Sequence, residues 1–352
     1  MKTTAALAAG SGLGNRKRAP RNRTVETDAS EVVQLRNRLL VPEAIAGSNF
    51  VGRTVLGDCF ATFERLPHGS VDLLVLDPPY NLNKKFGGKT FSRVPVDEYT
   101  AWLRALFGAV RPLLKPTATA YICGDWLSSA SIFTAAAEYF KIRNRITWER
   151  EKGRGALANW KNASEDIWFC TVSDRFTFNV EAVKLRRRVL APYRHDDGRP
   201  KDWCESDAGN LRETHPSNLW TDITVPFWSM PENTDHPAQK SEKFAAKLIL
   251  ASSNPGDLVF DPFLGSGTTS VIAKKLGRRF CGIELDESYA LLAEKRLGLA
   301  DADPTIQGYE GGVFWERNTL ALQAQSAKPG RARRADLITQ AEMFNARQGS
   351  LS

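Results

Sequence analysis

The chain has few of the residues that hold structural metals or form disulfide frameworks. Its 352 residues include 5 cysteines and 4 histidines, and no two cysteines form a Cys-x-x-Cys pair. Structural zinc sites and disulfide-stabilised domains both depend on closely or regularly spaced cysteines. We therefore expect no structural zinc, no other metal site and no disulfide framework.

Long hydrophobic runs are also missing. No apolar run approaches the roughly 20 residues that span a bilayer, and Ala5–Ala9 is too short for the hydrophobic region of a secretory signal. We expect a cytoplasmic protein without a membrane segment. The net charge of +8 and the pI near 9.2 favour a polyanionic partner, although many soluble proteins are equally basic.

One short motif carries more information than the composition. The apolar run Val71–Leu76 is typical of a buried parallel strand, and Asp77, Pro78, Pro79 and Tyr80 follow it directly. Open α/β sheets place ligands beyond the carboxyl ends of such strands. A carboxylate, carbonyls on a stiff backbone and an aromatic ring suit an exocyclic amino group on a nucleobase. The alternative is an ordinary Asp-Pro turn.

A second motif lies nearly 200 residues later, an approximate spacing that leaves room for other elements. Residues 257–261 read as a strand that enters the glycine turn Gly265–Gly267, a helix over 268–276 and a second strand, Arg279–Glu284. Glycine turns let a ligand approach the backbone, and a carboxylate at the second strand end accepts from ribose hydroxyls. This pattern predicts a nucleoside-cofactor site.

The turn departs from the dinucleotide-binding fingerprint. Ser270 stands at the third small-residue position and Phe263 precedes the turn. A sulfonium cofactor has no pyrophosphate to bind at a helix N-terminus, so it suits this sequence better than a dinucleotide. Packing of Phe263 in the core is the alternative.

Together these motifs resemble the DNA amino-methyltransferases that use S-adenosylmethionine. The catalytic motif precedes the cofactor motif, which is similar to the β group of that family, whose sheet is circularly permuted. Gly57–Cys59 and His236–Lys240 match two further segments of the group. The resemblance covers about residues 50 to 298 and departs at Ser241, where the group often has proline.

The resemblance implies a site-specific enzyme that moves a methyl group from S-adenosylmethionine to adenine N6 of a base flipped out of double-stranded DNA. The resemblance implies that Asp77 and the Pro78 carbonyl accept hydrogen bonds from the target amine and that the Tyr80 ring stacks on the base. Glu284 would hold the ribose, Asp58 the adenine and Lys240 the methionine end of the cofactor. The implied catalytic residues are Asp77, Pro78, Pro79 and Tyr80, and the implied cofactor-binding residues are Asp58, Lys240, Asp261, Phe263, Gly265, Ser266, Gly267, Thr268 and Glu284.

The fold expected from these patterns is α/β, a doubly wound and mostly parallel sheet with circular permutation and an inserted target-recognition subdomain. Strands are expected over 117–123, 142–148 and 164–171, with 175–178 as the hairpin partner of the last, and helices over 97–114, 127–140 and 243–252. In such a sheet the catalytic and cofactor strands could be neighbours.

Five segments follow from the same patterns: a basic mobile tail over 1–48, a catalytic half over 49–148, a target-recognition insert over 149–233, a cofactor-binding half over 234–299 and a C-terminal extension over 300–352. The insert is assigned to DNA because cationic residues and tryptophans alternate along it, as expected of a surface that contacts phosphates and bases. A surface domain with solvated arginines is the alternative.

Several functions stay open on sequence alone. The nearest alternative is methylation of cytosine N4, an amine of the same kind. Within the family that the motifs resemble, Asp at position 77 favours adenine as the target. A nicotinamide-dependent oxidoreductase would use the glycine turn but leaves Asp77–Tyr80 unexplained, and a third reading is a DNA-binding module without catalysis. The resemblance also allows a homodimer and a cognate restriction endonuclease, which no sequence feature decides.

Overall fold

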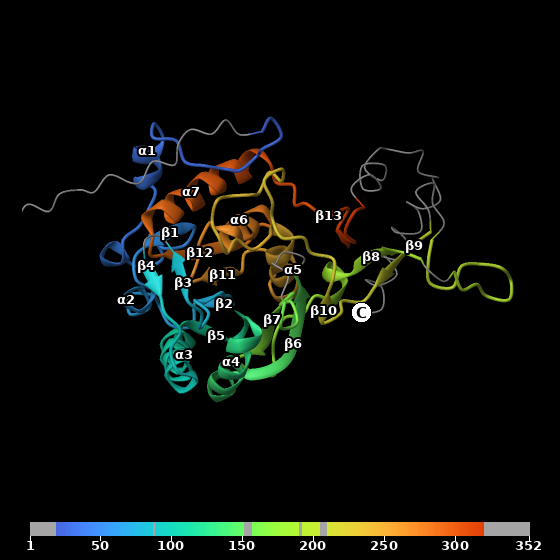
Figure 1. Ribbon diagram of the computed structural model, residues 1–352, viewed down its shortest axis with the longest axis horizontal. Helices are drawn as coiled ribbons and strands as arrows, with labels where there is room; N and C mark the ends of the chain where they lie inside the picture. Colours follow the sequence, from blue (N-terminus) through green and yellow to red (C-terminus); the bar gives the residue numbers. More distant parts are fainter. Residues whose placement is uncertain (1–18, 87–88, 151–156, 190–191, 205–209, 320–352) are drawn as a thin grey trace, which may run out of the picture.

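A large mixed sheet forms the centre of the protein (Figure 1). The computed structural model describes residues 19–86, 89–150, 157–189, 192–204 and 210–319. In these residues the sheet has eight strands, which in spatial order are β1 (Arg53–Leu56), β12 (Arg279–Glu284), β11 (Leu258–Asp261), β2 (Val71–Leu76), β5 (Leu114–Gly124), β7 (Ser164–Thr171), β6 (Lys141–Glu149) and β10 (Leu219–Trp220).

Strand direction follows the expected pattern with one exception. All neighbours pair in parallel except at β7, which is antiparallel to both β5 and β6. The expectation of a hairpin between 164–171 and 175–178 is wrong, because residues 175–178 form no strand and β7 already has a partner on each side. Short-range alternation suggested a hairpin, whereas β7 pairs with strands that lie earlier in the chain.

Helices cover both faces of this sheet, as a doubly wound fold requires. On one face lie α2 (Cys59–Phe63), α3 (Val96–Val110) and α4 (Trp126–Tyr139); on the other lie α5 (Glu242–Ser252), α6 (Thr268–Lys275) and α7 (Glu287–Ala302) (Figure 1). Each face has its own core: Leu103 and Ile132 belong to the first, Leu248 and Ile272 to the second. The α/β class and the doubly wound sheet are therefore confirmed.

A four-stranded sheet stands beside the large one. Its order is β13 (Tyr309–Glu310), β14 (Val313–Trp315), β8 (Leu185–Arg188) and β9 (Leu211–Thr214). This small sheet combines strands of two expected segments: β8 of the insert pairs in parallel with β14 of the C-terminal extension. The insert range 149–233 also supplies β7 and β10 to the large sheet.

The contact between α5 and the small sheet contains buried charges. Lys243 and Lys247 lie four residues apart on α5, and their Nζ atoms lie 2.7 and 2.6 Å from the Asp222 carboxylate. Lys243 also donates to the carbonyl of Trp315 in β14. Buried charges need such partners, so this cluster ties α5 to the small sheet.

The remaining short elements lie near the chain's beginning and in its connections: α1 (Val32–Arg36), η1 (Pro42–Ala44), η2 (Arg111–Leu113), η3 (Val180–Val183) and the hairpin β3 (Lys84–Phe86) and β4 (Lys89–Phe91). Residues 19–48, expected as part of a mobile tail, include two buried leucines, Leu35 and Leu40. Arg36 of α1 pairs with Glu287 at the start of α7. The basic composition of this segment concealed its few core contacts; residues 1–18 lie outside the described part.

Candidate active site

The two sequence motifs meet at one edge of the large sheet. β11 pairs in parallel with β2, with Val259 opposite Leu73 and Phe260 opposite Leu74. β12 lies on the other side of β11, so Asp77 and Pro262, which follow their strands, and Glu284, which ends β12, lie at the same end of neighbouring parallel strands. The prediction that the catalytic and cofactor strands are neighbours is confirmed.

A cavity of about 420 Å³ opens at this edge, between the ends of β2, β11 and β12. Most of the predicted site residues line it, namely Asp58, Asp77, Pro78, Pro79, Tyr80, Lys240, Phe263, Gly265 and Glu284. Asp261, Ser266, Gly267 and Thr268 are not among the residues that line it. One cavity therefore joins both motifs.

Asp77 lies at the centre of a hydrogen-bonded cluster of charged groups. Its Oδ1 accepts from the Tyr80 hydroxyl at 2.8 Å, and its Oδ2 lies 2.6 Å from Lys240 Nζ. Lys240 Nζ is also 3.3 Å from the Tyr80 hydroxyl and 3.4 Å from Glu165 Oε2. The other carboxylate oxygen of Glu165 accepts from Arg150.

Burial and charge act on the pKa values in this cluster in opposite ways. Burial raises the pKa of Tyr80 well above its ordinary value, and the charges of Asp77 and Glu165 raise it further. For Lys240, burial lowers the pKa, but attraction to Asp77 and Glu165 outweighs burial and raises it overall. Tyr80 is therefore a neutral hydroxyl and Lys240 an ammonium at neutral pH.

The backbone after Asp77 is held by a bond from α3. The Tyr99 hydroxyl donates to the Pro79 carbonyl at 3.0 Å, and Asn81 exchanges two hydrogen bonds with the backbone of Val94. These bonds do not involve the Pro78 carbonyl. Because proline also fixes φ, the segment is rigid before any ligand arrives.

The opposite wall consists largely of the glycine turn between β11 and α6. Gly265 has φ +54°, and a Cβ there would lie 3.0 Å from the His236 ring. Gly267 has φ +86°, and a Cβ there would lie 2.7 Å from the Cβ of Ala293 in α7. Left-handed backbone and close packing both require glycine at these positions.

Glu284 fixes this wall from the end of β12. One carboxylate oxygen accepts from the Gly265 N–H at 2.7 Å and the other from the Asp286 N–H at 2.8 Å. Burial raises the pKa of Glu284 above its ordinary value. A carboxylate has about four lone-pair sites, so each oxygen keeps capacity to accept from a ligand hydroxyl.

Three of the predicted residues, Asp261, Ser266 and Thr268, stabilise the glycine turn without lining the cavity. Asp261 is buried and accepts from the Phe263 N–H at 3.0 Å, and burial raises its pKa to about 7. Arg296 of α7 donates to the Ser266 carbonyl at 2.8 Å and to the Thr268 hydroxyl at 2.9 Å. These residues shape the turn from outside the cavity.

Asp58 has a structural role at the site as well. Its side chain caps α2 by accepting from the N–H groups of Phe60 and Ala61 at 2.9 and 3.2 Å. The same residue lines the cavity. Phe263 likewise lines the cavity while it packs on Trp102 of α3, with ring centroids 6.4 Å apart.

Two charged residues of the site were missed in the sequence. Glu165 is the second residue of β7 and Arg150 directly follows β6, and neither belongs to a recognisable motif. Two adjacent carboxylates, Glu165 and Asp166, at the start of an apolar run were the available signal, because Glu and Asp are almost never fully buried unless they are paired. The structure also brings His236 and Tyr289 to the cavity, with ring centroids 4.4 Å apart.

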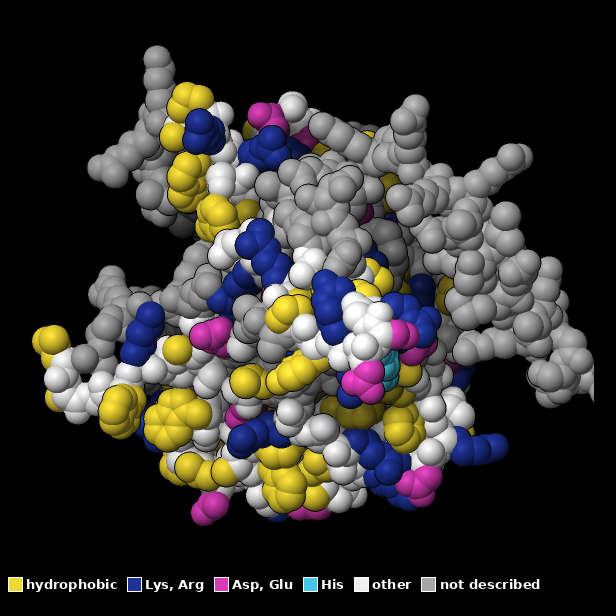
Figure 2. Space-filling model, turned by 90° about the vertical axis from the view of Figure 1, so that its right-hand side faces the viewer, with side chains coloured by type: hydrophobic (Ala, Val, Ile, Leu, Met, Phe, Trp, Pro, Cys, Tyr) yellow, Lys and Arg dark blue, Asp and Glu magenta, His cyan; other side chains and the backbone are white. Residues whose placement is uncertain are grey.

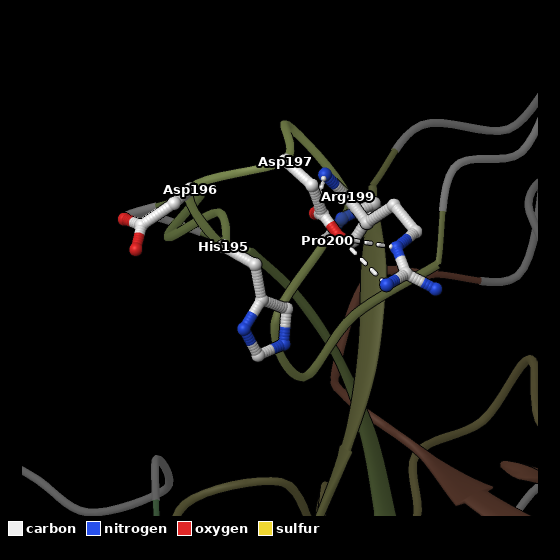
Figure 3. Close-up of a pocket in the computed structure, with 5 residues that line it drawn as sticks. All are labelled: His195, Asp196, Asp197, Arg199 and Pro200. Atoms are coloured by element: carbon white, nitrogen blue, oxygen red, sulfur yellow. Dashed lines mark hydrogen bonds and ion pairs between the residues drawn. The ribbon is translucent and has the colours of Figure 1, made fainter.

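A second hollow lies far from these groups, at the turn 195–200 of the small sheet's long connection. Figure 3 shows His195 and Asp196 pointing away from Arg199, whereas Asp197 turns toward it. Arg199 pairs with Asp197 at 2.6 Å, and both side chains are exposed. This hollow of about 460 Å³ is the open inside of one turn, and the side chains that line it do not point toward a common centre.

Among the residues that the structure describes, no group of three or more His, Cys, Asp or Glu side chains could hold a metal. Within the described part of the chain, no helix is long and apolar enough to cross a membrane.

The fold and the cavity define a doubly wound α/β protein with a nucleoside-sized site at the carboxyl ends of its parallel strands. Comparison with known proteins makes this specific: a family model described as DNA methylase, of the N6 and N4 methyltransferases, matches residues 71–295. The chain belongs to this DNA methyltransferase family. The family assignment sets aside the nicotinamide-dependent oxidoreductase.

Individual relatives agree with the family. The chain is similar to DNA adenine methyltransferase YhdJ of Escherichia coli, at 32% identity over 69% of this chain and 82% of that protein. It is similar to the type II methyltransferase M.HpaI of Haemophilus parainfluenzae, at 30% identity over 70% and 74%. The solved PvuII DNA methyltransferase, a cytosine-N4-specific enzyme, shares the fold with a TM-score of 0.51 at 17% identity, over 72% of this chain and 92% of that one.

Proposed function

We propose that the protein transfers a methyl group from S-adenosylmethionine to adenine N6 of a flipped-out base in double-stranded DNA. The observation that carries this proposal is the single cavity with the Asp77–Tyr80 segment on one wall and Gly265 with Glu284 on the other. Membership in the family supports methyl transfer to DNA. The adenine-methylating relative and Asp at position 77 support the choice of base.

The cavity fits S-adenosylmethionine. Its volume of about 420 Å³ lies within the usual range for small-ligand sites, roughly 300–1,000 Å³. Glu284 would accept from the ribose hydroxyls, Asp58 would lie at the adenine, and Phe263 and Gly265 would contact the methionine part. When bound, the sulfonium supplies an electrophilic methyl group.

The other wall fits an exocyclic amine. Asp77 and the Pro78 carbonyl would accept the two N–H groups of the target nitrogen, which turns its lone pair toward the methyl group. Tyr80 would stack on the extruded base, and its hydroxyl bond to Asp77 fixes the ring in place. Such orientation can contribute on the order of 7–11 kcal/mol to the rate.

Double-stranded DNA as partner requires extrusion of the base, which costs a few kcal/mol. We assign DNA recognition to residues 149–233, in which exposed Trp160 and exposed Arg188 lie outside the core. Permutation of the sheet, the segment boundaries, a homodimer and a restriction partner are part of the same proposal and need their own tests.

Cytosine N4 methylation is the second candidate, because the same two acceptors would fit the amine of cytosine. The test is to incubate the purified chain with S-adenosylmethionine carrying a labelled methyl group and duplex DNA of varied sequence. Digestion to nucleosides then separates the products. Label in N6-methyladenine supports the proposal, label in N4-methylcytosine selects the second candidate, and no label in DNA refutes both.

A further inference from the structure

In this structure both oxygens of the Asp77 carboxylate are already occupied by the protein's own donors. The Tyr80 hydroxyl holds Oδ1 at 2.8 Å and the Lys240 ammonium holds Oδ2 at 2.6 Å. Each oxygen keeps one further lone pair, but a target amine that donates to Oδ2 competes there with the Lys240 ammonium. The Tyr80 hydroxyl can release Oδ1 while its ring stays in place, because Glu165 Oε2 lies 3.4 Å away as a second acceptor, whereas Oδ2 is released only when the Lys240 ammonium moves.

Lys240 cannot leave by a shift of its backbone. Its carbonyl accepts from the Thr268 hydroxyl at 3.1 Å, and residue 241 begins the N-terminal cap of α5. The side chain is 13% exposed, so the ammonium has little access to water. A buried ammonium without a partner is costly, and its next position must therefore contain a second carboxylate.

Glu165 is that carboxylate. Its Oε2 lies 3.4 Å from Lys240 Nζ, and its side chain is 6% exposed. Arg150 binds the other oxygen, which orients the carboxylate and leaves Oε2 beside Lys240 Nζ and the Tyr80 hydroxyl. Both residues line the same cavity as Asp77.

We propose that Glu165 is a positioning residue that receives the Lys240 ammonium when a target amine occupies Asp77 Oδ2. A small rotation of the lysine side chain exchanges one carboxylate for the other, and the ammonium stays paired throughout. The inference rests on the proposed function, since it requires an exocyclic amine as substrate, but it holds for adenine and for cytosine.

The exchange predicts that substitutions of Glu165 and Lys240 have non-additive effects on KM for duplex DNA. In Glu165→Gln the ammonium has no second carboxylate, stays on Asp77 and competes with the base. Charged hydrogen bonds contribute about 1.5–3 kcal/mol, so we expect KM for duplex DNA to rise about tenfold or more. In the double variant with Lys240→Met the competitor is gone, and KM returns to within about threefold of the wild type.

The experiment measures kcat and KM for duplex DNA in the wild type, both single variants and the double variant. Cofactor affinity is measured beside them by calorimetry and is expected to stay within about twofold. Glu138→Gln is the matched control, because it removes an exposed carboxylate from α4, outside residues 149–233 and away from the cavity. A duplex with 2-aminopurine at the target position reports extrusion of the base by its fluorescence.

Three results would overturn the inference: Glu165→Gln behaves like the wild type, its defect persists unchanged in the double variant, or Lys240→Met loses cofactor affinity. The last result would instead support the role that the family resemblance implies for Lys240, at the methionine end of the cofactor. A wild-type protein that methylates no DNA would instead refute the proposed function, and this outcome is distinct from the other three.

Discussion

The large and the small sheet both carry many charged residues but arrange them differently. At the edge of the large sheet, Asp77, Lys240 and Glu165 are buried and share partners in one network. In the small sheet, Arg186 pairs with Glu213 and Arg187 with Glu316, as separate pairs at the surface. Figure 2 shows that side of the molecule, with Lys and Arg side chains interspersed with acidic ones.

This difference shows where a change of one residue has a large effect. In a buried network, removal of one charge leaves the others unpaired at low dielectric, which is costly. Exposed pairs contribute about 0–1 kcal/mol each, because water and salt screen them. The predictions below test this contrast.

The largest effect is expected at Asp77. Asp77→Ala removes the acceptor for the target amine, and methyl transfer should fall by at least about 10³-fold, the upper range for loss of one preorganised group. Cofactor affinity, measured by calorimetry, should survive. Glu284→Ala is the control on the opposite wall and should weaken cofactor binding instead; an Asp77→Ala variant with full activity would falsify the proposed acceptor.

A pH effect on stability is expected at Asp261. Its pKa is raised from 3.8 to about 7 in the folded state, so the folded protein binds the proton more tightly than the unfolded chain. The free energy of unfolding therefore decreases as pH rises from about 4 to about 7, by at most about 4 kcal/mol from this residue.

The Asp261→Asn variant isolates this contribution. Its amide oxygen can still accept from the Phe263 N–H, but it does not titrate. Urea denaturation of both proteins across this pH range should show that the wild type loses stability relative to the variant. Parallel curves for the two proteins would mean that Asp261 is already ionised at low pH.

A smaller effect is expected at Tyr80. Stacking of a base on an aromatic ring contributes roughly 1–3 kcal/mol, so Tyr80→Ala should weaken methyl transfer more on paired DNA than on DNA with a mismatched target base. Tyr80→Phe keeps the ring and loses only the hydroxyl with its bonds to Asp77, Lys240 and Glu165, which makes it the matched control. Equal losses on both substrates would remove the stacking argument.

The smallest effect is expected at the surface of the small sheet and its connection. Arg188 and Lys201 are exposed, and replacing each by Ala should weaken DNA binding for all sequences and lower the salt dependence by about one ion per residue. Binding is measured by fluorescence anisotropy at several salt concentrations. Arg104→Ala on α3, an arginine outside residues 149–233 whose side chain is 42% exposed, is the control; an equal change there would disprove a local DNA surface.

Sequence patterns predicted the elements of the large sheet well where periodicity was strong. The expected strand over 164–171 and the strand Arg279–Glu284 are found with the same bounds. The helix expected over 243–252 is α5, which begins one residue earlier. The partner of β7 was mistaken, because strand pairing depends on distant segments and not on the alternation within each one.

The candidate site divides in the same way. Asp77–Tyr80 and the glycine turn were recognisable because each function requires certain residue types at adjacent positions. Glu165 and Arg150 were not, since the importance of Glu165 depends on its proximity to Lys240, 75 positions later in the chain, and that of Arg150 on its bond to Glu165. Burial of Glu165 is a property of the folded sheet.

By itself, the sequence determined the class of the fold, the two motifs and the family they belong to, because local residue order encodes strands, turns and contacts between adjacent residues. The tertiary structure decided which groups meet. It placed β2 beside β11, so that both motifs open into one cavity, and it put Lys240 between Asp77 and Glu165. Such encounters depend on how strands pair and helices pack across the whole chain, which no single segment specifies.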